Sequence, residues 1–284
     1  MRILITGIKG FTGRYLESKL IECGHEVIGL QSDLMDAFSL NREIKKVQPD
    51  SVVHLAGLSF VAHSNKKDFY NINIIGTYNL LNSLDSASLD LKNVLIASSS
   101  NVYGGEHKHH IREEDALNPA NDYAVSKLSS EYVSKLFMDR LPIFITRPFN
   151  YTGVGQSIDF LIPKIIRHFL EKKPQITLGN TNIHREFNDV RNVVDIYSDL
   201  LMKPFSGKIF NICTEETHSI TDVINMCEKI TEHKLEVKID AKLCRNNEAI
   251  KIAGNGQYLR NYTQSGGVFN LNDTLLWMLN KNNI

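Results

Sequence analysis

The sequence predicts an α/β protein, with a Rossmann-like, doubly wound parallel sheet and a small C-terminal lobe. Three observations lead to this prediction. Short apolar runs bounded by turn residues recur along the first part of the chain, and helical patterns separate them. A glycine-rich loop follows the first run and opens the first helical pattern. From about residue 153, loops rich in Gly, Asn, Gln and Arg break the alternation.

The apolar runs are expected to form the strands of this sheet. They lie at residues 2–6, 26–30, 51–55, 93–97, 142–146 and 208–212. Helical patterns run from the glycine-rich loop to about Cys23, across 68–84, onward from Asp122, near 160–170, over 220–231 and around Trp277. The segment after residue 231 is polar and basic, and we expect it to be irregular.

Composition excludes several classes of protein. Lys plus Arg equals Asp plus Glu at 32 each, so no overall field would attract the chain to nucleic acid or to an acidic membrane. No apolar run is long enough to span a bilayer, and no signal peptide is expected. The four cysteines form no CxxC pair, which predicts neither a disulfide framework nor a metal site and fits a cytoplasmic protein.

The glycine-rich loop has the pattern expected of a dinucleotide site. Glycine lets a pyrophosphate approach the backbone closely. The helix that begins there offers unpaired N–H groups and the positive end of its dipole. We therefore expect the cofactor to bind at Gly7, Lys9, Gly10, Phe11, Thr12 and Gly13.

The residues after the second predicted strand bear on which dinucleotide binds. An acidic residue there would accept a hydrogen bond from the ribose 2′-OH of NAD, but Leu30 is followed by Gln31 and Ser32. Lys9 lies inside the glycine loop, where a cation can meet a 2′-phosphate. Both features favour NADP(H). Asp33 is close enough to bond the ribose or the adenine, so NAD(H) stays an open alternative.

These features divide the chain into two parts. Residues 1–155 are expected to form an NAD(P)-binding Rossmann domain, to which residues 181–212 return. Residues 156–180 and 213–284 are expected to form a substrate-binding lobe over the sheet edge. Parallel sheets bind ligands beyond the carboxyl ends of their strands, so we expect the substrate under this lobe.

Tyr123 and Lys127 are four residues apart and share one face of the predicted helix. A free tyrosine ionises near pH ~10. A nearby ammonium and an oxidised nicotinamide both favour the phenolate, so we expect Lys127 to lower the pKa of Tyr123 and to hold the nicotinamide ribose. Tyr123 would then exchange a proton with a carbonyl or alcohol oxygen while the cofactor carries a hydride.

Three serines follow the fourth predicted strand and would lie beside this site. Ser99 could donate a hydrogen bond to the same substrate oxygen, although Ser98 and Ser100 are adjacent and leave the choice open. A serine that only caps the loop is the alternative.

Together these residues resemble the extended short-chain dehydrogenase/reductase family over nearly the whole chain. His54-Leu-Ala-Gly57, Asn73, Tyr103-Gly104 and Arg147-Pro-Phe-Asn150 extend the resemblance beyond the motifs above. It implies an NAD(P)-dependent oxidoreductase with Ser99, Tyr123 and Lys127 as catalytic residues. It also adds Leu34, Leu55, Ala56, Gly57, Asn73 and Pro148 to the cofactor site, beside Asp33.

Three later segments resemble the nucleotide-diphosphate sugar branch of the family, and within it the reductases of 6-deoxy-4-ketohexoses such as GDP-6-deoxy-4-keto-mannose. They are residues 147–156, 184–191 and 207–213. The resemblance implies substrate contacts from Ser100, Asn101, Asn150, Arg185 and Arg245. Arginine suits a pyrophosphate, because its planar fork pairs with phosphate oxygens. For Arg185 and Arg191, an ion pair with Glu186 or Asp189 is the alternative.

Three positions separate the reactions that this branch catalyses. Relatives that act as 4,6-dehydratases carry an acid just after the catalytic Ser or Thr, where this chain has Ser100 and Asn101. Epimerase–reductases use a cysteine and a histidine, at positions that are Asn101 and Phe160 here. The resemblance therefore implies NADPH-dependent reduction of the C4 keto group of a nucleotide-diphosphate 4-keto-6-deoxyhexose. An NAD-dependent 4-epimerase is the alternative.

The resemblance also implies a partner and a biological setting. Many relatives pair the helix that bears Tyr123 with its copy, so we expect a homodimer. The product would be a deoxysugar nucleotide for a surface polysaccharide. A non-catalytic sensor of the NADP redox state does not need the Tyr–Lys pair, which this chain keeps. The nucleotide base and the C4 stereochemistry stay open.

Overall fold

The computed structural model describes residues 1–61, 63–244 and 249–280. Over these residues, the main sheet consists of parallel strands in the order β10-β5-β4-β3-β1-β2. Their bounds are Arg2–Thr6 (β1), Glu26–Gly29 (β2), Ser51–His54 (β3), Asn93–Ala97 (β4), Ile143–Pro148 (β5) and Ile209–Ile212 (β10). The doubly wound parallel sheet is confirmed, and the predicted strands shift by only one or two residues.

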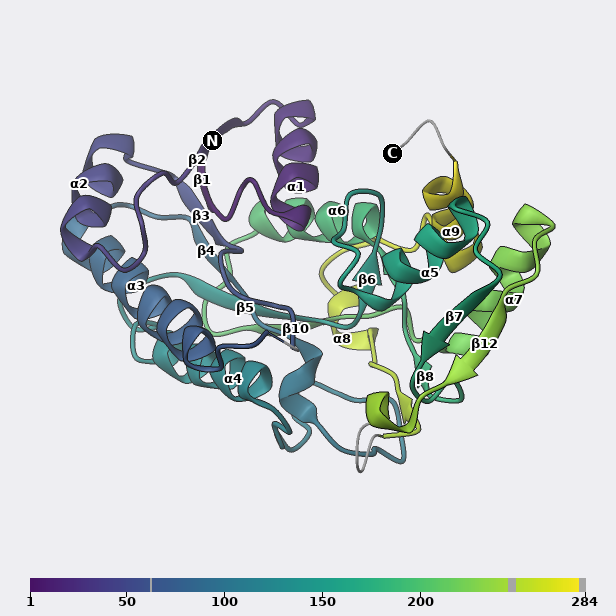
Figure 1. Cartoon of the computed structure of the whole chain (residues 1–284). Helices are drawn as coiled ribbons and strands as arrows, with labels where there is room; N and C mark the ends of the chain where they lie inside the picture. The colour runs from purple at the N-terminus through teal and green to yellow at the C-terminus, as the bar shows by residue number, and fades with distance from the viewer. Residues whose placement is uncertain (62, 245–248, 281–284) are drawn as a thin grey trace.

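Helices cover both faces of this sheet (Figure 1). One face carries α1 (Phe11–Glu22) and α6 (Val190–Leu201), and the other carries α2 (Ala37–Val47), α3 (Gly76–Ala87) and α4 (Asp122–Lys135). The prediction omitted α2 and α6. The helix expected over 68–84 is a π-helix, Phe69–Ile75, that runs directly into α3.

The C-terminal part has a core of its own, beside the sheet. Helices α5 (Leu161–Leu170), α7 (Ile220–Thr231) and α9 (Leu271–Leu279) pack there against β7 (Gln175–Leu178). β7 pairs in parallel with β12 (Glu236–Ile239). The expectation of an irregular segment after residue 231 is therefore wrong at β12, because Leu235 and Val237 alternate toward the lobe core while their neighbours are solvated.

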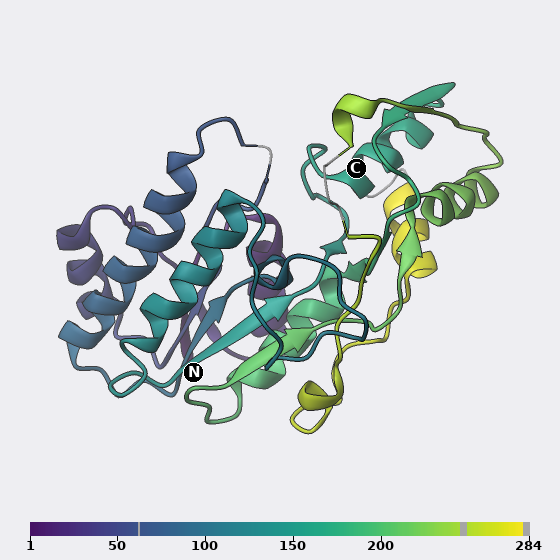
Figure 2. The ribbon, with the colours of Figure 1, turned by 90° about the horizontal axis from the view of Figure 1, so that it is seen from below.

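Short elements join the two parts. β8 (His184–Arg185) pairs with β11 (His218–Ser219) and β13 (Lys251–Ile252), while β6 (Tyr151–Thr152) pairs with β9 (Asn188–Asp189). Two 3₁₀ turns, Ser100–Tyr103 and Ala241–Leu243, and helix α8 (Gln257–Arg260) complete the described elements. Figure 2 shows the purple-to-blue helices at one end, the green-to-yellow lobe at the other, and chain crossings between them.

The last helix returns to the first. Trp277 of α9 lies edge-on to Tyr15 of α1, with ring centroids 5.9 Å apart. The lobe is thus packed against the helix that follows the glycine loop. No helix within the described ranges is long and apolar enough to cross a membrane.

Candidate active site

The glycine loop leaves its backbone open to a ligand. Gly7 has a φ of +70°, and a Cβ there would lie 2.8 Å from the backbone nitrogen of Ala56. A Cβ on Gly13 would lie 2.4 Å from the carbonyl oxygen of Gly7. Gly10 caps α1 without a side-chain hydrogen bond, so the N–H groups of the first turn have no side-chain partner at this cap. The loop therefore fits the pyrophosphate of a dinucleotide.

Hydrogen bonds fix the end of β3 against this loop. The Thr6 hydroxyl accepts from the Ala56 N–H at 3.0 Å and contacts Nδ1 of His54 at 2.7 Å. Nε2 of His54 lies 2.9 Å from the Thr77 hydroxyl. Burial, and then the charge of Lys127, lower the pKa of His54 to about 3. His54 is therefore a neutral scaffold residue, and it holds Leu55, Ala56 and Gly57 beside the glycine loop.

Asn73 connects this loop to α4. Its amide donates to the Ser126 hydroxyl at 2.8 Å and accepts from the Leu58 N–H at 2.9 Å. A Cβ on Gly57 would lie 2.8 Å from Oδ1 of Asn73 and 3.9 Å from Nζ of Lys127. Gly57 therefore allows the three predicted residues Gly57, Asn73 and Lys127 to meet in one place.

Tyr123 lies in the first turn of α4, where Asn121 caps the helix through the Ala124 N–H at 2.9 Å. Burial raises the pKa of Tyr123 to about 12, and a hydrogen bond from Ser99 opposes this rise. In the protein without cofactor, desolvation of the phenolate dominates, and the lowering expected from Lys127 with an oxidised nicotinamide stays a prediction. Burial likewise lowers the pKa of Lys127 to about 8, against the charge of Glu131.

The three serines have different partners. Ser98 donates to Oε1 of Glu131 at 2.5 Å. Ser99 is 5 % exposed, acts on the Tyr123 phenol, and accepts from the N–H and the amide of Asn101 at 3.2 and 3.0 Å. Ser99 therefore both caps the turn at Ser100–Tyr103 and faces Tyr123, and Asn101 holds it there.

A buried ion pair lies one helical turn beyond Lys127. Nε and Nη2 of Arg147 donate to the two oxygens of Glu131 at 2.9 and 2.6 Å, and the Arg147 side chain is 2 % exposed. Nη1 of Arg147 also donates to the hydroxyl of Tyr103, which donates to Asn211 at 2.8 Å. Glu131 escaped the sequence prediction, although it follows Lys127 by four residues on the same helical face.

Tyr151 was also missed, and it contacts the glycine loop. Its hydroxyl lies 2.8 Å from the Thr12 hydroxyl, and its ring stacks on Phe11 with centroids 6.1 Å apart. It also acts electrostatically on Tyr123. The only signal in the sequence was its position directly after Asn150 in the motif that carried the resemblance.

Of the predicted substrate residues, Ser100 and Asn101 lie in the turn that Ser99 caps, and the others come from different elements. Asn150 is exposed, and Arg185 is half-buried on β8, where Nη1 donates to the carbonyl of His184 at 2.9 Å. Arg191 makes the alternative ion pair, with two hydrogen bonds to Asp189 at 2.9 and 2.7 Å. Arg245 lies outside the described residues.

The remaining predicted cofactor residues lie around the same sheet edge. Pro148 is buried at the end of β5, and Leu34 is buried beyond β2. Lys9 and Asp33 are exposed. Within the described ranges, no cluster of three or more His, Cys, Asp or Glu side chains could hold a metal ion.

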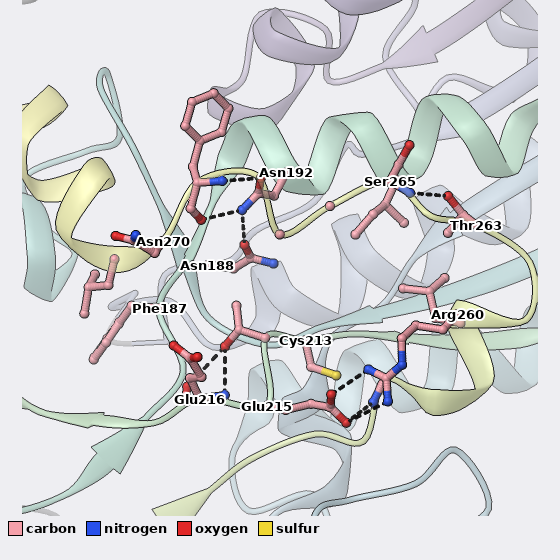
Figure 3. A pocket seen from close by; sticks show the side chains of 18 of the residues that line it. Phe187, Asn188, Asn192, Cys213, Glu215, Glu216, Arg260, Thr263, Ser265 and Asn270 are labelled. Atoms are coloured by element: carbon pink, nitrogen blue, oxygen red, sulfur yellow. Dashed lines mark hydrogen bonds and ion pairs between the residues drawn. The ribbon is translucent and has the colours of Figure 1, made fainter.

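A cavity of about 280 Å³ lies away from this site (Figure 3). Its walls include Asn188 of β9, Asn192 of α6, Cys213 after β10, and the ion pair between Glu215 and Arg260. Ser99, Tyr123 and Lys127 are not among its lining residues. The cavity is therefore separate from the candidate active site.

A dinucleotide loop, with Tyr123, Lys127 and Ser99 at the carboxyl edge of a parallel sheet, defines an oxidoreductase of the extended short-chain dehydrogenase/reductase type. The chain belongs to the NAD dependent epimerase/dehydratase family, whose model matches residues 3–213.

Two curated relatives and one solved structure narrow the comparison. The chain is 32% identical over 266 residues to a GDP-6-deoxy-D-talose 4-dehydrogenase of Aggregatibacter actinomycetemcomitans, covering 92% of this chain and 90% of the relative. It is 30% identical over 278 residues to a GDP-6-deoxy-D-mannose reductase of Pseudomonas aeruginosa, with the same coverage. The structure of RMD from Pseudomonas aeruginosa complexed with NADPH has a TM-score of 0.90 and 29% identity, covering 98% of this chain and 97% of that chain.

Proposed function

We propose that this enzyme reduces the C4 keto group of a nucleotide-diphosphate 4-keto-6-deoxyhexose, with NADP(H) as the preferred cofactor. The observation that carries the proposal is the half-buried phenol of Tyr123 beside Ser99, with a pKa that desolvation raises to about 12. Such a phenol keeps its proton at neutral pH. It can give that proton to the strongly basic alkoxide that forms when a hydride adds to a ketone.

Each site residue has a role in this reaction. The cofactor supplies the hydride. Tyr123 protonates the new alkoxide, Ser99 holds the carbonyl oxygen, and Lys127 binds the nicotinamide ribose. Gly7, Gly10 and Gly13 leave room for the pyrophosphate, as their contacts support.

The residues next to the site support a reaction at one carbon. Asn101, at the position of an extra acid or thiol in relatives, donates its amide to Ser99 at 3.0 Å. Phe160, at the position of the extra histidine, packs on Phe60 with ring centroids 5.8 Å apart. Neither side chain can move a proton near neutral pH. Dehydration, or epimerisation at C3 and C5, would lack its second acid–base group.

The substrate assignment rests on the relatives. Both named enzymes act on GDP-linked 6-deoxyhexoses, and the talose enzyme's name locates its chemistry at C4. We propose that Asn150, Arg185 and Arg245 contact the diphosphate and that the lobe, residues 156–180 and 213–284, closes over the sugar nucleotide. The NADPH of the similar structure and the exposed Lys9 support NADP(H).

The test is a panel of nucleotide-linked 4-keto-6-deoxysugars, incubated with the protein and NADPH while absorbance at the nicotinamide band is followed. We expect oxidation of NADPH with a GDP-linked member, and no oxidation with the Tyr123→Phe variant. If no member oxidises NADPH, and the protein instead interconverts 4-epimers with bound NAD, the proposed reduction is wrong and the 4-epimerase takes its place.

A homodimer is part of the proposal. The outer faces of the π-helix, α3 and α4 expose large apolar side chains, namely Tyr70, Ile75, Tyr78, Tyr132 and Leu136. Exposed apolar side chains on neighbouring helices favour association with a second copy. Replacing Tyr132 and Leu136 together by Glu is expected to yield a monomer in light scattering. A cytoplasmic location and a role in surface polysaccharide synthesis complete the proposal.

A further inference from the structure

The acidic group that the sequence lacks after β2 comes instead from helix α2. Oε1 of Glu43 accepts the N–H of Gln31 at 2.9 Å, and Oε2 accepts the N–H of Ser32 at 2.7 Å. These two residues directly follow Leu30 at the end of the second strand. One carboxylate therefore occupies both N–H groups at the carboxyl end of β2.

Glu43 is an anion at neutral pH. Burial opposes ionisation, but the Ser32 side chain and the N–H groups of Gln31 and Ser32, together with the charge of Lys46, lower the pKa of Glu43 below its ordinary value. Its carboxylate is half-buried, so solvent screens it less than a fully exposed charge.

The end of β2 adjoins the glycine loop. Gly29 pairs with Ile5 of β1, and the Leu30 N–H donates to the Ile5 carbonyl at 2.9 Å. A Cβ on Gly29 would lie 2.4 Å from Cγ2 of Ile8, inside the glycine loop. In dinucleotide-binding folds, the residues after the second strand meet the ribose that carries the adenine. Glu43 thus adds a negative charge to the edge of the cofactor site where a 2′-hydroxyl and a 2′-phosphate differ.

We propose that Glu43 determines cofactor specificity by opposing the 2′-phosphate of NADP(H) and favouring the 2′-hydroxyl of NAD(H). Lys9, inside the glycine loop, acts in the opposite direction. The wild-type protein therefore uses both cofactors, and the charge of Glu43 limits its preference for NADP(H). This inference rests on the proposed function only in its dinucleotide site, and it does not depend on the sugar substrate.

The test measures equilibrium dissociation constants of NADH and NADPH by nicotinamide fluorescence, with no sugar present. In Glu43→Gln, whose amide oxygen still accepts one N–H, we expect the ratio of affinities to shift about tenfold toward NADPH. Glu43→Asp keeps the charge and is expected to stay within about threefold of the wild-type ratio. Lys9→Met is expected to weaken the binding of NADPH and to leave the binding of NADH unchanged. Glu22→Gln, with the same charge change at the exposed end of α1, is the control.

The outcomes separate the two proposals. If Glu43→Gln weakens the binding of both cofactors equally, so that the ratio of their affinities is unchanged, Glu43 has only a structural role. That result overturns the inference. The same conclusion follows if Glu43→Asp and Glu22→Gln shift the ratio as much as Glu43→Gln does. A wild-type protein that binds neither cofactor overturns the dinucleotide site itself, and with it the proposed function.

Discussion

Helix α4 carries two polar systems, one half-buried and one buried, that differ in how their charges are balanced. Tyr123 and Lys127 are desolvated with few partners, so burial moves both pKa values toward the neutral forms, about 12 and about 8. Glu131, one turn further along, meets the fork of Arg147 in two hydrogen bonds and accepts a third from Ser98. The helix therefore separates side chains that can exchange a proton from side chains that hold the site in place.

The difference shows how a reactive group is kept reactive. A carboxylate or guanidinium that is fully paired is fixed in one protonation state. A phenol and an amine that are buried without such partners stay responsive to any charge that arrives beside them. We expect changes in the first system to affect rate and changes in the second to affect stability.

The largest expected effect is on rate. Tyr123→Phe removes the proton donor, so kcat/KM for NADPH oxidation should fall by about 10²–10⁴-fold. The midpoint of thermal unfolding should change little. Tyr132→Phe, at an exposed position of the same helix, is the matched control and should retain full activity. Comparable turnover in the two variants would remove Tyr123 from the mechanism.

The next effect is on stability. Arg147→Met leaves the carboxylate of Glu131 buried without its cation, so the free energy of unfolding in urea should fall by about 3–5 kcal/mol. Arg140→Met breaks an exposed ion pair with Asp85 and should cost at most about 1 kcal/mol. If the two variants lose the same free energy of unfolding, the buried ion pair contributes no more to stability than the exposed one.

A second buried carboxylate, Glu186, shows how an acid behaves when its donors are neutral. Glu186 is 1 % exposed and accepts hydrogen bonds from uncharged donors, among them the N–H groups of Gly254 and Thr214 and the Thr214 hydroxyl. Burial raises its pKa from 4.5 to about 7 despite these bonds. The folded state then binds the proton more tightly than the unfolded state does. This contribution to stability is complete below pH 4.5 and is lost as the pH rises through 7.

Glu186→Gln should remove this pH dependence, which amounts to at most about 3 kcal/mol. Urea unfolding of the wild type and the variant at several pH values between about 5 and 8 would measure this pH dependence, because stability changes over that range. Glu216→Gln, at an exposed position nearby, should leave the wild-type profile intact. If the free energy of unfolding of Glu186→Gln still falls as the pH rises, another group causes the pH dependence.

The smallest effect concerns Lys127. Its pKa is lowered by burial, so the folded protein is penalised for the charged form below pH of about 8, and the penalty disappears as the pH rises toward 10.5. Lys127→Met should therefore stabilise the protein at pH 7 by about 1–2 kcal/mol, a discounted value because the side chain is only half-buried. Turnover should fall. If Lys127→Met is less stable than the wild type at pH 7, burial of the charged Lys127 does not destabilise the folded protein.

Sequence patterns were sufficient to predict the strands of the main sheet but not all of the helices that cover it. The strands are apolar over consecutive residues, a local signal. Helix α2 has only Leu40 and Ile44 fully buried, so its apolar stripe is thin. Helix α6 does have a polar stripe, at Arg191, Asp195 and Asp199, so the sequence held a helical signal there that the prediction did not use.

The candidate site shows the same limit. Tyr123, Lys127 and Ser99 stand out because their spacing and their position after a strand are visible in the chain. Glu131 and Tyr151 gain their roles from partners far away in the sequence. Glu131 meets Arg147 from another strand, and Tyr151 meets Thr12 across 139 residues. Neither contact can be recognised from the residues adjacent to it in the sequence.

Helix α6 covers the same face of the sheet as α1, and this has a consequence for synthesis of the chain. Leu16 and Leu20 of α1 belong to a core that α6 completes. At ribosomal rates of about 5–20 residues per second, roughly 10–40 s pass between synthesis of these two helices. During that interval the face of the sheet that α1 shares with α6 is incompletely covered, and its apolar side chains are accessible to chaperones that act at the ribosome.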